Sequence, residues 1–102
     1  MPNEQGQPNQ QQIQIKITDD ILRGAYANAM SVAHTKEEFI LDFMTVIPHQ
    51  RAGTVSARIL TSPGHLKRII SALQENLKKY EGSFGKVDIA DAPGSEIGFT
   101  AN

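Results

Sequence analysis

The sequence predicts an α+β fold in which an antiparallel four-stranded sheet carries one long C-terminal helix on one face. Large apolar residues alternate with polar or small ones through most of 13–61, which is the period of strands, and recur every three to four residues over 63–81, which is the period of a helix. The links after the second and third strands are short enough for hairpins. Because the helical pattern follows all the strand patterns, the order is β-β-β-β-α.

Length and composition limit the classes of protein to consider. The chain has 102 residues, a formal net charge of −1 and no cysteine. This length predicts one domain, and the balanced charge argues against nucleic acid or an anionic membrane as a partner. Without cysteine, disulfides, thiolate metal sites and cysteine nucleophiles are excluded. No apolar run suits a membrane span, and the polar start is not that of a secretory signal, so we expect a soluble cytoplasmic protein.

Four segments have the pattern of strands. Alternating isoleucines predict the first strand at 13–17. The others are expected at about 25–34, 39–47 and 54–61. Pro48 ends the third, because proline cannot donate a hydrogen bond to the ladder.

The helix has a start signal, an apolar stripe and a stop signal. Ser62 is the expected N-cap, and Pro63 occupies the first helical position. Lys78 and Lys79 are expected in the last turn, and Gly82 as the residue that ends the helix. The stripe consists of Leu66, Ile69, Ile70, Leu73, Leu77 and Tyr80.

Both ends of the chain differ in composition from the middle. Residues 1–12 are rich in Gln, Asn, Pro and Gly, which is typical of a disordered tail. Residues 86–102 carry only isolated apolar side chains and are expected to be loosely ordered, with an added strand left open. The domain is therefore expected at 13–85.

Short hairpin loops predict which side chains share a face of the sheet. We expect Ala33 to pair with Phe39 and Asp42 with Arg58. One face then carries mainly small and aromatic residues, and we expect the helix to pack there. Its members are Ala27, Ala29, Ser31, Ala33, Phe39, Leu41, Phe43, Val55, Ala57 and Ile59.

The opposite face is too apolar to be left in water. Its members are Tyr26, Asn28, Met30, Val32, Ile40, Asp42, Met44, Val46, Ser56, Arg58 and Leu60. Exposed apolar patches of this size mark contact surfaces. The first strand or a second copy of the chain must cover this face, and we favour a homodimer joined sheet on sheet or edge to edge.

Polar residues on this face are the first candidates for a site. Asp42 and Arg58 are expected to form a cross-strand ion pair, or alternatively an anion-binding group with its positioning carboxylate. Tyr26 suits an interface, and Asn28 is expected to hydrogen-bond across the sheet or to the partner. Met30 and Met44 complete the candidate interface.

Histidines provide little support for catalysis or metal binding. His34 lies near Glu37 and Glu38, which could form a general base or a metal site, although a capping role fits better. His49 and His65 have no metal-ligand spacing with it. We therefore expect no catalytic residue, no cofactor and no metal.

Two stretches of the sequence resemble a known family. These stretches, AYANAMSVAHTKEEFILDF and SARILTSPGHLKRIISALQENLKKYEGSFG, are similar to a small bacterial and archaeal family that is a domain of unknown function. The likeness covers about 13–85, and the chain departs from it in its Ala-rich second strand and at Gly64. It implies no activity, but it marks His65, Lys67 and Arg68 as a candidate partner-binding surface at the helix start. The matching positions are Tyr26, Asn28, His34, Glu38, Phe39, Leu41, Asp42, Phe43, Arg58, Ser62, Pro63, His65, Lys67, Arg68, Ala72, Leu73 and Asn76.

The leading hypothesis for function is a small, non-enzymatic structural or adaptor protein that self-associates through its apolar sheet face. The alternative is a module that binds a ligand or nucleic acid with Arg58 and the Lys67–Arg68 end of the helix. A third hypothesis, an enzyme centred on His34 and Asp42, has the least support in the sequence.

Overall fold

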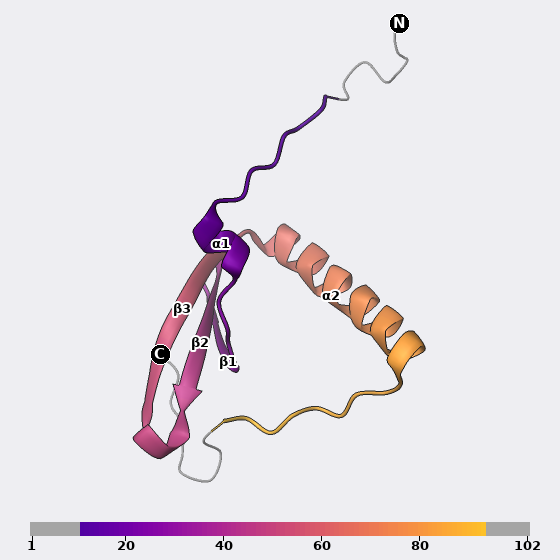
Figure 1. Ribbon diagram of the computed structural model, residues 1–102. Coiled ribbons are helices and arrows are strands. Elements are labelled where there is room, and N and C mark those ends of the chain that lie inside the picture. Colours follow the sequence, from indigo (N-terminus) through magenta and orange to yellow (C-terminus); the bar gives the residue numbers. More distant parts are fainter. Residues whose placement is uncertain (1–10, 94–102) are drawn as a thin grey trace, which may run out of the picture.

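The computed structural model describes residues 11–93 and has α+β architecture (Figure 1). Its elements are the helix α1 (Asp19–Arg23), the strands β1 (Ala29–His34) and β2 (Phe39–Ile47), the 3-10 turn η1 (Pro48–Gln50), the strand β3 (Ala52–Thr61) and the helix α2 (Pro63–Phe84). The strands form one antiparallel sheet in the order β1-β2-β3, so β2 is central. The predicted class and long C-terminal helix are confirmed. Most of the predicted N-terminal tail and residues 94–102 of the C-terminal one lie outside the described residues.

The predicted first strand does not join the sheet, which has three strands over the described residues and not four. Residues 11–18 have no regular secondary structure, and the side chain of Ile15 is 86 % exposed. After this segment the chain forms α1, which the sequence did not predict and which begins with Asp19 and Asp20. These two carboxylates lie in the first turn, where they interact favourably with the helix dipole.

The hairpin between β1 and β2 differs from the prediction by one residue. His34, and not Ala33, is the partner of Phe39. The turn is closed by the Thr35 amide, which donates to the Glu38 carbonyl at 2.9 Å, and Thr35 Oγ1 accepts from the amides of Glu37 and Glu38 at 3.2 Å. Because side chains alternate along a strand, this shift moves every β1 side chain to the other face.

The register between β2 and β3 is the predicted one over most of its length. Asp42 pairs with Arg58, as expected. A bulge then interrupts the ladder, because Phe43 pairs with Ala57 and the next residue, Met44, pairs with Val55. The extra β3 residue turns Val55 to the opposite face from the one predicted.

The long helix α2 begins where the sequence predicted and ends later. Ser62 Oγ accepts the amide N–H of His65 at 3.1 Å, as an N-cap does. The helix continues through Gly82 to Gly85, whose φ of 98° is left-handed, so no basic residue lies in its last turn. Figure 1 shows α2 leaving the end of β3 and diverging from the sheet, and none of its residues is buried.

The buried apolar core is small and lies on the central strand. Within residues 11–93, the buried apolar residues are Leu41, Met44 and Val46, all from β2. Leu41 faces α2, whereas Met44 and Val46 lie on the reverse of the sheet. The strands therefore hold the fold together, and the helix contributes less than the sequence predicted.

Candidate self-association surface

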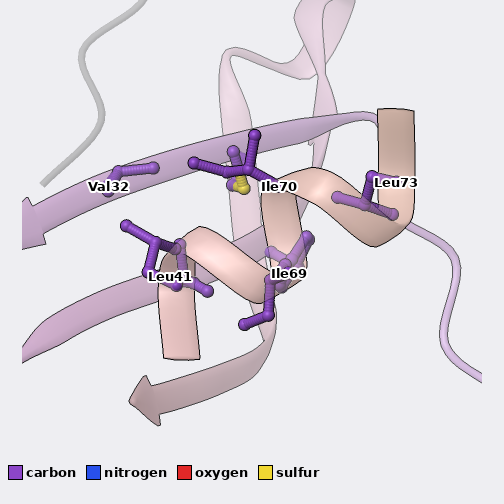
Figure 2. A pocket seen from close by; sticks show the side chains of 8 residues that line it. Val32, Leu41, Ile69, Ile70 and Leu73 are labelled. Carbon is purple, nitrogen blue, oxygen red and sulfur yellow. The ribbon is translucent and has the colours of Figure 1, made fainter. Parts of the chain in front are cut away.

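An apolar cleft separates α2 from the sheet. It has a volume of about 260 Å³, and Figure 2 shows side chains from the strands and the helix projecting into it. The strand residues Met30 and Val32 line it because of the one-residue shift in the β1 register. The sequence placed both on the reverse face, so that prediction is wrong. The full lining is Met30, Val32, Leu41, Phe43, Leu66, Ile69, Ile70 and Leu73.

Exposed apolar side chains continue beyond the cleft along α2. Leu73 is 66 % exposed and Phe84 is 75 % exposed. The rings of Tyr80 and Phe84 lie together near the C-terminal end of the helix, with centroids 4.9 Å apart. We call the whole set the helix-side surface. It consists of Met30, Val32 and Ile59 on the sheet and Ile70, Leu73, Leu77, Tyr80 and Phe84 on α2, all exposed by about half or more.

The reverse of the sheet is less open than the sequence predicted. At its centre Asp42, Met44 and Val46 are buried within the single chain. The prediction that this face exposes Met44 and Val46 is therefore wrong, and its exposed large apolar residues are Leu60 and Val55. More of the exposed apolar side chains lie on the helix side of the sheet than on its reverse.

Asp42 and Arg58 form a two-pronged ion pair across β2 and β3. Arg58 Nε donates to Asp42 Oδ1 at 2.7 Å, and Nη2 donates to Oδ2 at 2.8 Å. Asp42 is 3 % exposed, whereas the Arg58 side chain is 59 % exposed and covers it. The hydrogen bond from Arg58 lowers the pKa of Asp42 although burial opposes this, and the same bond raises the pKa of Arg58. Each carboxylate oxygen of Asp42 accepts a hydrogen bond from Arg58, which is the geometry of a structural cross-strand pair.

Tyr26 and Asn28 precede β1 and contact the far end of the sheet. The Asn28 side chain bonds to the backbone of Val46, so its hydrogen bonds across the sheet are made within one chain. The Tyr26 carbonyl accepts from Thr45 Oγ1 at 2.8 Å, while the residue itself is 75 % exposed. An exposed tyrosine held by its backbone is a fixed surface group.

The residues of the two alternative hypotheses are not brought together. His34 lies on the helix side, with its ring 5.3 Å from that of Phe39, whereas Asp42 lies on the reverse. Arg58 also lies on the reverse, whereas Lys67 belongs to α2 and is exposed, as are His65 and Arg68 beside it. The sheet therefore separates His34 from Asp42, the two groups that an enzyme site would need to combine.

Residues 11–93 contain no cluster of three His, Asp or Glu side chains that could hold a metal ion. In the same part of the chain, no helix is long and apolar enough to cross a membrane.

Comparison with protein families gives one result. A family model described as "protein of unknown function (DUF3467)" matches residues 1–89. The chain belongs to this family. The DUF3467 match confirms the resemblance to a domain of unknown function, and it includes the whole sheet and all of α2. No curated protein and no solved structure matches the chain.

The sequence-based prediction did not include Phe84 in the apolar stripe of the helix. Phe84 fell outside the predicted helix because Gly82 was interpreted as its end. The spacing nevertheless indicates that Phe84 belongs to the helix, because Phe84 follows Tyr80 by four residues and continues the stripe.

Proposed function

We propose that this DUF3467 protein is a non-enzymatic structural or adaptor module that works as a homo-oligomer, with a dimer favoured. The observation that carries the proposal is the helix-side surface. A 22-residue amphipathic helix has no buried residue in the single chain, and the sheet face beside it is also open. Patches of this kind in soluble proteins mark association surfaces.

The energetics of α2 favour a partner. Most of the stability of a helix in a protein comes from packing of its apolar face. Fully burying a Leu, Ile or Phe side chain contributes about 1.5–3 kcal/mol. On α2 at least five such groups, Tyr80 included, remain half exposed or nearly so, and association would complete their burial.

A second copy is the occupant that fits the composition. The formal net charge of −1 opposes self-association very little. A domain of about 100 residues buries only about two thirds of the surface of its unfolded chain, so contacts between copies add to a thin margin of stability. The small core confined to β2 agrees with this reasoning.

The test is the molar mass of the purified full chain in solution. Light scattering at micromolar concentration should give a dimer, and Leu77→Glu should convert it to a monomer. Ser71→Glu is the matched control, because Ser71 is exposed and lies away from the apolar stripe on α2. A wild-type monomer at this concentration would overturn the proposal.

A further inference from the structure

We infer that two copies join by antiparallel pairing of their α2 helices, with the two-fold axis passing near residue 75. This inference rests on the proposed homo-oligomer and specifies its geometry. It follows from the spacing of the apolar residues, from the charges beside them and from the position of the cleft.

The spacing on α2 is that of a coiled-coil seam. Successive members are separated alternately by four and three residues, without exception, from the first turn to the last. Two successive steps cover seven residues, which is the heptad spacing of the apolar seam in a coiled coil. The members are Leu66, Ile70, Leu73, Leu77, Tyr80 and Phe84.

The seam is self-complementary when the second helix is reversed. Residues equally far from position 75 then lie opposite each other, so Leu66 meets Phe84 and Leu73 meets Leu77 of the second copy. Ile70 meets Tyr80 in the layer between them. Each aromatic ring faces an aliphatic side chain, which fills the layers evenly. Parallel pairing would instead place the two Tyr80 rings, and the two Phe84 rings, against each other.

The polar flanks of the seam also match in the reversed orientation. Lys67, Gln74 and Glu81 follow one another at intervals of seven and occupy one flank. In an antiparallel pair this flank meets its own copy, so Lys67 of each chain lies beside Glu81 of the other, and the two Gln74 amides meet at the axis. Charges of opposite sign at the two ends of such a flank set the orientation in which two helices pair.

A parallel pair would have no such contacts. The flank with Lys67 and Glu81 would meet the other flank of the second helix, which carries Ile69, Asn76 and Ser83 and no charge. The antiparallel arrangement also sets each helix N-terminus beside the C-terminus of its partner, which is favourable for the two helix dipoles. Charge therefore selects the antiparallel orientation.

The position of the cleft agrees with the reversed orientation. Only the N-terminal half of α2, from Leu66 to Leu73, lines the cleft, and the C-terminal half diverges from the sheet (Figures 1 and 2). Reversal brings the C-terminal half of the second helix, with Tyr80 and Phe84, alongside this N-terminal half. The two aromatic side chains would then cover the open side of the cleft.

Crosslinking between single-cysteine variants tests the orientation, because the natural chain has no cysteine. Lys67→Cys and Glu81→Cys are made separately, mixed, and treated with a short thiol-to-thiol crosslinker. We expect a crosslinked dimer from the mixture and little from either variant alone. A dimer in light scattering that forms no 67–81 crosslink, or one that crosslinks Lys67→Cys to itself, overturns the antiparallel pairing but not the proposed function. A monomer overturns both.

Charge exchange gives an independent readout. Lys67→Glu alone, or Glu81→Lys alone, should raise the dimer dissociation constant about tenfold, because two symmetric ion pairs become repulsive. The double variant Lys67→Glu/Glu81→Lys should return it to within about threefold of the natural value. Both single changes favour the dipole of the isolated helix, so weaker dimers would not reflect helix loss. Unchanged dissociation constants in the single variants would overturn the pairing.

Discussion

The side chain of Asn28 bonds to the backbone of Val46 as a peptide group would. Its Nδ2 donates to the Val46 carbonyl at 3.0 Å, and its Oδ1 accepts the Val46 N–H at 2.8 Å. The Asn28 amide also donates to the Met44 carbonyl at 3.0 Å. The ladder between β1 and β2 is thereby extended beyond Ala29, which ties the start of an edge strand to the central one.

Asn28→Asp should destabilise the fold in a pH-dependent way. At pH 7 the carboxylate cannot donate to the Val46 carbonyl, and we expect a loss of about 1–3 kcal/mol in the free energy of unfolding. A protonated aspartate can donate, so the folded state raises the pKa of this group. The loss should therefore shrink as the pH falls toward about 4 and grow as it rises. Urea unfolding of variant and natural chain across this range measures the difference.

Asn28→Ala is the control for this prediction. It removes the donor and the acceptor together, so its loss of stability should not vary with pH. If Asn28→Asp showed the same constant loss, the donor role of Nδ2 would be wrong.

The Asp42–Arg58 pair predicts how the natural chain responds to acid. Its hydrogen bond lowers the pKa of Asp42 below the ordinary value of 3.8. The stabilisation is therefore fully present above the unfolded-state pKa and is lost as the pH falls through the lower, folded-state pKa. Asp42→Asn should remove this part of the acid dependence, as measured by urea midpoints between pH 2 and 5. An identical acid slope in the variant would contradict the assignment.

Single and double variants separate the contribution of the Asp42–Arg58 ion pair to stability from the cost of leaving Asp42 buried without a partner. Arg58→Met leaves the Asp42 carboxylate buried and unpaired, which is more costly than losing both charges. The double variant Asp42→Leu/Arg58→Met should therefore unfold at a higher urea concentration than Arg58→Met alone. The reverse order would show that Asp42 is well solvated without its partner.

Some of the fold could be predicted because local chemistry determines it. Pro48 ends β2, and the capping of Ser62 with Pro63 starts α2, so both boundaries were predicted correctly. The pairing of Asp42 with Arg58 was predicted from the register that a short loop between the two strands implies. In each case, signals local to the turn or the helix start were sufficient.

The errors arose where the sequence allowed two nearly equal arrangements. A loop of four residues closed by Thr35 and a loop of five differ little in sequence, yet they place Met30 and Val32 on opposite faces. The alternating isoleucines at 13–17 have the period of a strand, but the pattern does not show whether this segment pairs with an edge strand of the sheet. The apolar stripe of α2 was likewise evident, whereas its exposure was not.

Leu41→Ala and Ile15→Ala should differ widely in cost. Leu41 is 7 % exposed on the central strand, so its truncation should lower the free energy of unfolding by about 2–5 kcal/mol. Ile15 is 86 % exposed, and its truncation should change stability by less than about 0.5 kcal/mol. Chemical denaturation of both variants measures the contrast. A loss above about 1 kcal/mol for Ile15→Ala would show that residues 13–17 pair with a sheet edge after all.

Two glycines at the end of α2 should respond in opposite ways to the same substitution. Gly82 lies within the helix, and a Cβ there meets nothing within 4 Å, so Gly82→Ala should stabilise by about 0.5–1 kcal/mol. Gly85 has a φ of 98°, which an L side chain tolerates poorly, so Gly85→Ala should destabilise by about 1 kcal/mol. For a domain of about 100 residues, 1 kcal/mol corresponds to about 4–8 °C in Tm, which calorimetry resolves. Stabilisation by both substitutions would place the helix end beyond Gly85.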